Sequence, residues 1–231
     1  MTTLSVASLG VRKVNEELRR APAGSTFELV DVIGEHNLAV GLVEGVDVRI
    51  EGNVGYYVGG LCGGTDGGPT VTVDGFAGWG VGENLMGGEV RVRGNASEST
   101  GSSAHGGFVV VEGDASSRAA ISLKGGTVLV AGDVGHASAF MAQAGTLLVG
   151  GDAGHDLGDS LYEAVVYVGG QVSSLGADAR VEDLTDDDVA TVRALVDRGG
   201  PAFAHVDPEN VTRVASARTL YNFDALKNQK Y

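Results

Sequence analysis

Apolar residues alternate with polar or small residues over short stretches that recur along most of the chain. Each stretch holds two apolar positions separated by one residue, and each ends at a glycine that is followed by Asp or Asn in most repeats. The apolar pairs of the regular part are Val71 and Val73, Val90 and Val92, Val109 and Val111, Val128 and Val130, Leu147 and Val149, and Val166 and Val168. Strict alternation that ends in a glycine turn predicts a short strand with one face directed inward.

The turn glycines return at a fixed interval. From Gly75 to Gly170 they are nineteen residues apart, and the earlier Gly34 and Gly52 continue the pattern with intervals of eighteen and twenty-three. A repeat of this length is one turn of a solenoid, because it cannot bury its apolar face until a neighbouring turn stacks on it. The sequence therefore predicts an all-β fold, a single-stranded parallel β-helix with short helical caps. About seven to eight turns, each rising about 4.8 Å, would form a rod on the order of 35 to 40 Å long.

The glycine pattern also bears on the type of coil. Doublets such as Gly87 and Gly88, or Gly106 and Gly107, precede the turn glycine by six or seven residues and suit a corner with positive φ. A left-handed hexapeptide coil should be punctuated every six residues, whereas the intervals here are six and then thirteen. That fold is therefore disfavoured, and the handedness of the coil stays open.

Segments with helical periodicity flank the repeats. We expect residues 1–24 to form an N-terminal helical cap, 25–176 the β-helix, and 177–231 a C-terminal helix with a partner-docking tail. A helix from Ser8 to Arg20 would cover the first turn, whose end otherwise exposes apolar surface and unpaired strand edges. A docking helix for a partner is the alternative interpretation of this segment.

The C-terminal helix is predicted from its capping signals. Thr185 supplies a capping hydroxyl, and the three aspartates that follow it place negative charge at the positive end of the helix dipole. Arg198-Gly199-Gly200-Pro201 ends the helix. Residues 202–231 are too apolar for a solvated tail, so we expect them to pack along the rod or on another subunit.

Composition restricts the partners and the chemistry. The chain has 231 residues and a formal net charge of −14, which disfavours nucleic acids and anionic membranes as partners. No apolar segment reaches about eighteen residues, so we expect a cytoplasmic protein with no membrane span. Cys62 is the only cysteine, which excludes an internal disulfide and an iron-sulfur cluster held by four thiolates of this chain.

A column of carboxylates is the first candidate for chemistry. Asp114, Asp133 and Asp152 occupy equivalent positions nineteen residues apart, and Asn53 and Asn95 take the same place in earlier repeats. Such a column could bind a hard cation. Asp and Asn also suit tight turns because their side chains bond to local backbone. The sequence favours the turn interpretation, since like charges about 4.8 Å apart in water repel by only about 1 kcal/mol.

Histidine and cysteine offer weaker candidates. His136 and His155 are nineteen residues apart and could share a metal, but Ser174 stands where a third ligand would follow. Cys62 could be a nucleophile, although the sequence fixes no base beside it. A processed N-terminal nucleophile at Thr2 is conceivable, whereas structural roles for these residues are favoured. We therefore predict no catalytic, cofactor-binding or metal-binding residue in this chain.

The sequence Gly78-Trp79-Gly80-Val81-Gly82 lies inside the ladder of repeats. A dinucleotide fingerprint would need a following helix within a βαβ unit, and here another β repeat follows. Either these glycines allow close backbone packing, or a loop of a partner crosses there. The run, the repeats from Glu35 to Gly170 and the tail from Ser216 to Phe223 resemble the domain named after the Gly-x-Gly-x-Gly motif. That domain forms the C-terminal end of the large subunit of glutamate synthase, and a free-standing small subunit in N-methylglutamate synthase and related complexes.

The resemblance implies a non-catalytic structural subunit of a glutamate-synthase-like complex. A class II glutamine amidotransferase-like subunit would release ammonia, and a subunit with FMN and an iron-sulfur cluster would add nitrogen or methylamine to a 2-oxo acid. The β-helix would hold both in a hetero-oligomer. The segment from Tyr56 to Pro69, which carries the four extra residues of the long repeat, the glycine run and the tail are the expected contact surfaces. The candidate contacts are Tyr56, Tyr57, Cys62, Arg218, Tyr221 and Phe223.

Two other functions stay open. One is a free-standing β-helix that binds a glycan or a cation; the aromatic residues, such as Tyr56, Trp79 and Tyr162, are expected on different columns, which counts against it. The other is a subunit of a complex like formylmethanofuran dehydrogenase, in which the same domain occurs. The tail from Ser216 to Phe223 counts against that assignment.

Overall fold

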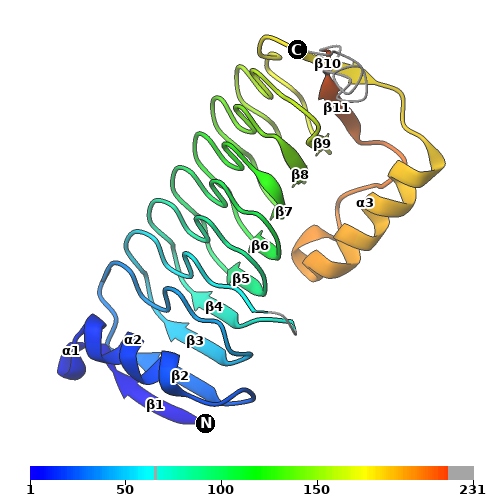
Figure 1. Cartoon of the computed structure of the whole chain (residues 1–231). Helices are drawn as coiled ribbons and strands as arrows, with labels where there is room; N and C mark the ends of the chain where they lie inside the picture. The colour runs from blue at the N-terminus through cyan, green and yellow to red at the C-terminus, as the bar shows by residue number, and fades with distance from the viewer. Residues whose placement is uncertain (65–66, 218–231) are drawn as a thin grey trace, which may run out of the picture.

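The computed structural model describes residues 1–64 and 67–217 and shows a rod of stacked turns (Figure 1). An eleven-stranded sheet runs along the rod in the order β1-β2-β3-β4-β5-β6-β7-β8-β9-β11-β10. The strands are β1 Thr2–Ser5, β2 Thr26–Val30, β3 Asp47–Glu51, β4 Thr70–Asp74, β5 Glu89–Val92, β6 Phe108–Val111, β7 Lys124–Val130, β8 Ala144–Val149, β9 Val165–Val168, β10 Ala179–Glu182 and β11 Thr212–Ser216. Strands β1 to β9 are parallel, so the predicted all-β parallel β-helix is confirmed.

The inward valines lie directly over one another. Val92 pairs with Val111, and Val111 pairs with Val130, each at the predicted nineteen-residue offset. All three are 0% exposed. Burial of one such side chain stabilises the fold by about 1.5 to 3 kcal/mol. Since every turn adds its valines to the same column, the core runs through the coil without interruption.

The side of the coil opposite the strands has an unusual backbone. Each turn there places every second residue in the left-handed region, as at Gly80, Gly82 and Asn84, with φ of 66°, 67° and 52°. A Cβ on Gly82 would lie 2.5 Å from Cγ2 of Val109, and one on Gly78 would lie 2.8 Å from the backbone of Gly55. The glycines of the motif therefore permit close packing between turns, which is one of the two interpretations that the sequence left open.

The aspartate column bonds to the backbone of the next turn. Asp114 Oδ1 accepts from the Asp133 N–H at 2.9 Å, and Asp133 Oδ1 accepts from the Asp152 N–H at 2.7 Å. Asn95 Oδ1 accepts from the Asp114 N–H at 3.0 Å in the same way. The turn interpretation holds, but the expected bond to local backbone was wrong. At this corner the N–H of the next turn points at the side chain, so each Asp or Asn ties two turns together.

The N-terminal cap differs from the prediction in its elements. The expected helix is two helices, α1 Val6–Leu9 and α2 Val11–Arg20, which meet at Gly10, where φ is 76°. Before them β1 pairs with β2, so the sheet begins well before residue 25. The four residues of β1 were too few to show an alternating pattern.

Helix α2 closes the first turn with apolar and polar contacts. Val14 and Leu18 are buried against the core. Asn15 donates from Nδ2 to the Asn37 carbonyl at 2.6 Å and accepts from the Ala39 N–H at 2.8 Å. It thus satisfies backbone groups that a preceding turn of coil would otherwise satisfy, which supports the cap interpretation.

The C-terminal segment folds back along the strand side of the rod (Figure 1). Helix α3 Asp186–Gly199 is followed by the short helix η1 Pro201–Phe203, and β11 then pairs antiparallel with β9. The predicted helix, with Thr185 as its N-cap and Gly200 as its C-cap, is confirmed. The residues buried between this segment and the outer face of the sheet include Val110, Leu129, Leu148, Tyr167, Val192, Leu195, Phe203, Val206 and Val211. The expected packing along the rod is therefore confirmed for the described part of residues 202–231, which ends at 217.

A polar cluster fixes the start of α3. Asp188 shares a capping box with Thr185, accepts from Tyr167 Oη at 2.6 Å and accepts from Arg213 Nε at 3.0 Å. Arg213 also pairs with Glu182 of β10. Burial alone would raise the pKa of Asp188, but these hydrogen bonds more than offset it and hold the pKa well below its usual value. Burial and the Asp188 carboxylate raise the pKa of Tyr167.

The end of α3 is held by a second group of contacts. Arg91 donates to the carbonyls of Gly199 and Arg198 at 2.9 and 3.1 Å, and so satisfies acceptors that the helix leaves open. Arg198 reaches back to Glu89 at 2.6 Å and lies over the Phe108 ring. Both ends of α3 are thereby tied to the sheet.

The aspartate column predicts a stability difference between two replacements of one residue. Asp133→Ala removes the acceptor for the Asp152 N–H and should lower the free energy of unfolding by about 1 kcal/mol. Asp133→Asn keeps an acceptor, as Asn95 does, and should cost less than half as much. Urea unfolding followed by circular dichroism measures both. Equal losses in the two variants would show that the inter-turn bond contributes nothing.

The polar cluster predicts acid sensitivity. The folded-state pKa of Asp188 lies below the ordinary 3.8, so its stabilisation is present above that value and is lost as the pH falls through the folded pKa. Asp188→Asn should lower the free energy of unfolding at neutral pH by about 1 to 3 kcal/mol. Its stability should also change less than that of the wild type between about pH 4 and pH 2. Parallel pH profiles of the two proteins in thermal unfolding would contradict this assignment.

Candidate interaction surfaces

Four aromatic rings lie together on the side of the coil opposite the strands, here called the turn side, near the N-terminal end. This aromatic platform consists of His36, Tyr56, Tyr57 and Trp79. His36 and Tyr56 are stacked with ring centroids 4.3 Å apart, and Trp79 and Tyr57 lie 5.8 and 6.3 Å from Tyr56. Tyr56 and Trp79 are each 46% exposed and Tyr57 is 40% exposed. The platform is therefore an accessible surface of aromatic side chains from three successive turns.

The platform corrects the expectation that the aromatic residues lie on different columns. Tyr56 and Trp79 are twenty-three residues apart, the same interval that separates Gly52 from Gly75. Val54 pairs with Ala77 at this offset, so Tyr56 and Trp79 fall on one column. Applying the local interval in place of nineteen would have found this pair in the sequence.

The backbone holds the platform in place. His36 Nδ1 accepts from the Tyr56 N–H at 2.8 Å, which fixes the imidazole under the tyrosine ring. A Cβ on Gly55 would lie only 1.9 Å from that nitrogen, so only glycine leaves room for it. The platform is pre-formed, because its rings are set by bonds and contacts within the coil.

The register change of the long repeat falls after the residues of the platform. Met86 N–H donates to the Cys62 carbonyl, still near the twenty-three-residue offset, whereas Glu89 N–H donates to the Pro69 carbonyl after the offset has returned toward nineteen. The insertion therefore falls between Cys62 and Pro69. Tyr56 and Tyr57 belong to the regular part of their turn, and their expected place on a bulge was wrong.

Cys62 is part of the core. It is 0% exposed, and its Sγ donates to the Ala39 carbonyl at 3.1 Å. Burial raises the pKa of the thiol to about 11. The predicted partner contact at Cys62 was therefore wrong, and the structural interpretation of this residue is supported.

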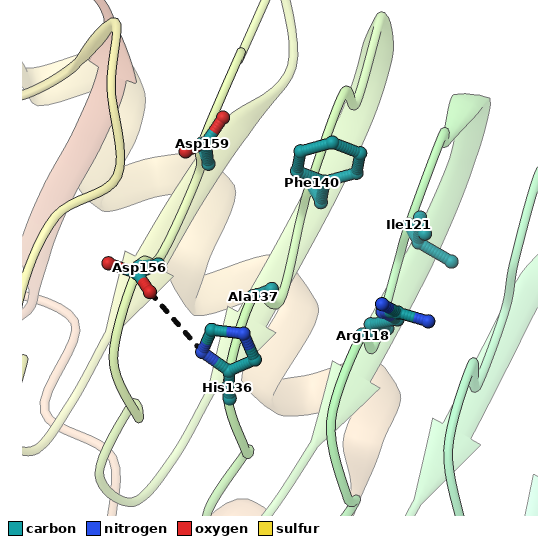
Figure 2. A pocket seen from close by; sticks show the side chains of 7 residues that line it. All are labelled: Arg118, Ile121, His136, Ala137, Phe140, Asp156 and Asp159. Atoms are coloured by element: carbon teal, nitrogen blue, oxygen red, sulfur yellow. Dashed lines mark ion pairs between the residues drawn. The ribbon is translucent and has the colours of Figure 1, made fainter.

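A groove of about 460 Å³ lies on the same turn side, closer to the C-terminal end of the rod (Figure 2). Its lining residues come from three successive turns: Arg118, Ile121, His136, Ala137, Phe140, Asp156 and Asp159. His136 Nδ1 lies 3.4 Å from Asp156 Oδ2, and Phe140 and Ile121 lie along the opposite part of the groove (Figure 2). The groove combines both signs of charge with an apolar strip.

The two histidines that could have shared a metal have separate contacts. His136 faces Asp156, whereas His155 Nδ1 lies 3.4 Å from the hydroxyl of Ser174. Within residues 1–64 and 67–217, no group of three or more His, Cys, Asp or Glu side chains is placed to hold a metal ion. The contact of Asp156 with His136 was not evident from spacing, because Asp156 follows His155 in sequence and faces the preceding turn.

Three predicted contacts, Arg218, Tyr221 and Phe223, lie outside the described residues. The described part of the chain has no helix long and apolar enough to cross a membrane.

Burial of Cys62 predicts low reactivity. In the native protein a thiol reagent should modify Cys62 at least about a hundredfold more slowly than in urea, because both solvent exclusion and a raised pKa suppress the thiolate. The rate of release of the chromophore from a disulfide reagent measures this. Rapid reaction of the native protein would show that Cys62 is accessible.

Comparison with known proteins identifies a relative of this chain. A scan against models of protein families gives no match. The chain is 52% identical over 227 residues to a protein of Rhizobium meliloti (strain 1021) named Protein GlxC, and the match covers 97% of each chain. Half of the positions therefore agree over almost the whole length of both chains. The chain belongs to the same family as Protein GlxC.

Proposed function

We propose that this chain is the non-catalytic structural subunit of a glutamate-synthase-like complex. The observation that carries the proposal is the Gly-x-Gly-x-Gly run within an uninterrupted coil, where Gly82 packs against Val109 and Gly78 against Gly55. The match to Protein GlxC covers the whole glycine run and nearly all of the coil, so it supports treating the two proteins together.

A stiff coil suits the task of holding two active sites at a fixed separation. Column after column of inward valines and inter-turn aspartate bonds resist bending. The C-terminal segment covers part of the strand side, while the described residues leave the turn side open (Figure 1). The aromatic platform and the charged groove lie on that open side, so both are available to partner subunits.

The proposed partners carry the chemistry. One is a class II glutamine amidotransferase-like subunit that releases ammonia from glutamine. The other is an FMN-binding subunit with an iron-sulfur cluster, which adds ammonia or an amine to a 2-oxo acid. The complex is a cytoplasmic hetero-oligomer in this proposal, and this chain contributes position only.

The aromatic platform favours a second candidate, a free-standing module that binds a glycan. Exposed neighbouring rings such as Tyr56 and Trp79 can pack against the faces of sugar rings. The two candidates differ in what accompanies the native chain: a protein partner in the first, none in the second.

Affinity purification of the tagged chain from its native host tests the proposal. We expect co-purifying subunits, a flavin absorption spectrum, and glutamine-dependent activity of the complex but no glutaminase or oxidoreductase turnover by the chain alone. An untagged host lysate passed over the same resin is the control. A monomer that binds glycans, a partner containing molybdenum or tungsten, or turnover by the isolated chain would each overturn the assignment.

A further inference from the structure

One part of the open turn side combines aromatic rings with a carboxylate that lacks a cation. A small cavity of about 150 Å³ lies beside the aromatic platform. It is lined by Asn37, Val40, Tyr57, Gly60, Leu61, Glu83 and Asn84. Leu61 is 58% exposed, so the cavity has an apolar rim next to the rings.

Glu83 and Tyr57 converge over Gly80. A Cβ on Gly80 would lie 2.7 Å from Tyr57 Cδ1 and 2.9 Å from Glu83 Oε2, so the carboxylate is within about 6 Å of the ring. Glycine at this position allows the ring and the carboxylate to approach each other this closely. Both groups also line the cavity, so a positive group that entered the cavity would meet the ring and the carboxylate together.

The Glu83 carboxylate is half-buried, and none of the ion pairs formed among the described residues includes it. Burial raises its pKa, which is the direction expected of a carboxylate without a compensating cation. Other carboxylates of the rod, such as Asp74 and Glu112, have arginines of this chain beside them. Glu83 therefore differs from them in lacking the cation that its position would suit.

We propose that the cavity between Tyr57 and Glu83 receives an arginine side chain of a partner subunit, with the aromatic platform as the surrounding contact. This inference rests on the proposed function, because it supplies one docking contact for such a partner. Arginine fits better than lysine, since its planar guanidinium stacks on an aromatic face and also bonds a carboxylate through two N–H groups. The net charge of −14 further favours a basic segment as the occupant.

The rings around the cavity suit an interface. Exposed tyrosine and tryptophan are enriched among the residues that dominate binding energy, because they bury a large area at small cost in side-chain entropy. The rings of Tyr56 and Trp79 already lie together on the coil before binding. Little conformational entropy would therefore be lost when a partner packs against them.

Trp79 allows a direct binding test, because it is the only tryptophan of the chain. Titration of the full chain with N-acetyl-arginine amide should give a saturable change in fluorescence. N-acetyl-citrulline amide has the same shape without the charge and should bind at least about fivefold more weakly. Glu83→Gln should reduce arginine binding to the citrulline level. The matched control is Glu163→Gln, an exposed glutamate between β8 and β9, which should leave binding unchanged.

Equal binding of the two probes, or unchanged binding in Glu83→Gln, would overturn the proposal. A stronger response to methyl glucoside than to the arginine probe would also overturn it, in favour of a glycan surface. The variants should unfold at the same temperature as the wild type, and Tyr57→Phe, which keeps the ring, should retain binding.

A second measurement tests the partner. Glu83→Gln should recover at least about threefold less partner subunit from the native host than Glu163→Gln does. Equal recovery would overturn the docking role even if the arginine probe binds. Failure of the wild-type chain to recover any flavoprotein would count against the proposed function, whereas failure of the probe to bind counts against the arginine site alone.

Discussion

Register between successive turns is the constraint on which the rest of this structure depends. Each turn satisfies its backbone by bonding to the turns on either side, so a residue can only lie over its counterpart. The pairing of Val92, Val111 and Val130 shows the result in the core. The same rule brings Tyr56 beside Trp79 and carries the bond from Asp133 to the backbone at Asp152. The valine core, the aspartate bonds at the corner and the aromatic surface therefore all follow from the alignment of successive turns.

Much of the fold could be predicted because equivalent residues of successive turns are separated by a nearly constant number of residues in the sequence. The strands, the parallel coil and the capping box at Thr185 all follow from spacing or from short-range signals. The cover over the strand side also had a signal that was missed. In β6 to β9 the outward position is apolar, at Val110, Leu129, Leu148 and Tyr167, whereas earlier strands place residues such as Arg49 and Thr72 there. A strand that is apolar on both faces is buried on both faces.

The surface details were harder to predict for definite physical reasons. An inserted segment lengthens the interval between repeats locally. If a nineteen-residue interval is assumed throughout, Tyr56 and Trp79 are wrongly placed on different columns. The direction of the aspartate bonds depends on the backbone at the corner, which spacing does not specify. Tyr57 and Glu83 approach each other over Gly80, whose left-handed conformation recurs in turns that hold other residues, such as Ala137 with φ of 54°. The repeat interval predicts which residues lie next to each other in successive turns, whereas the local backbone conformation decides which contacts those residues make.

The way the sheet ends limits what the molecule can do with its own copies. A coil that ended in a bare regular turn would offer the first strand of another molecule a continuation of the same winding. Here β11 lies antiparallel between β9 and β10, so it interrupts the parallel winding. The second reversal returns β10 to the common direction, but β10 is a short strand beyond the regular turns of the coil and is not a turn itself. Arg180 and Glu182 also place charge on that edge strand. Charge on an edge strand disfavours pairing with another chain, so among the described residues this end is poorly suited to head-to-tail growth into filaments.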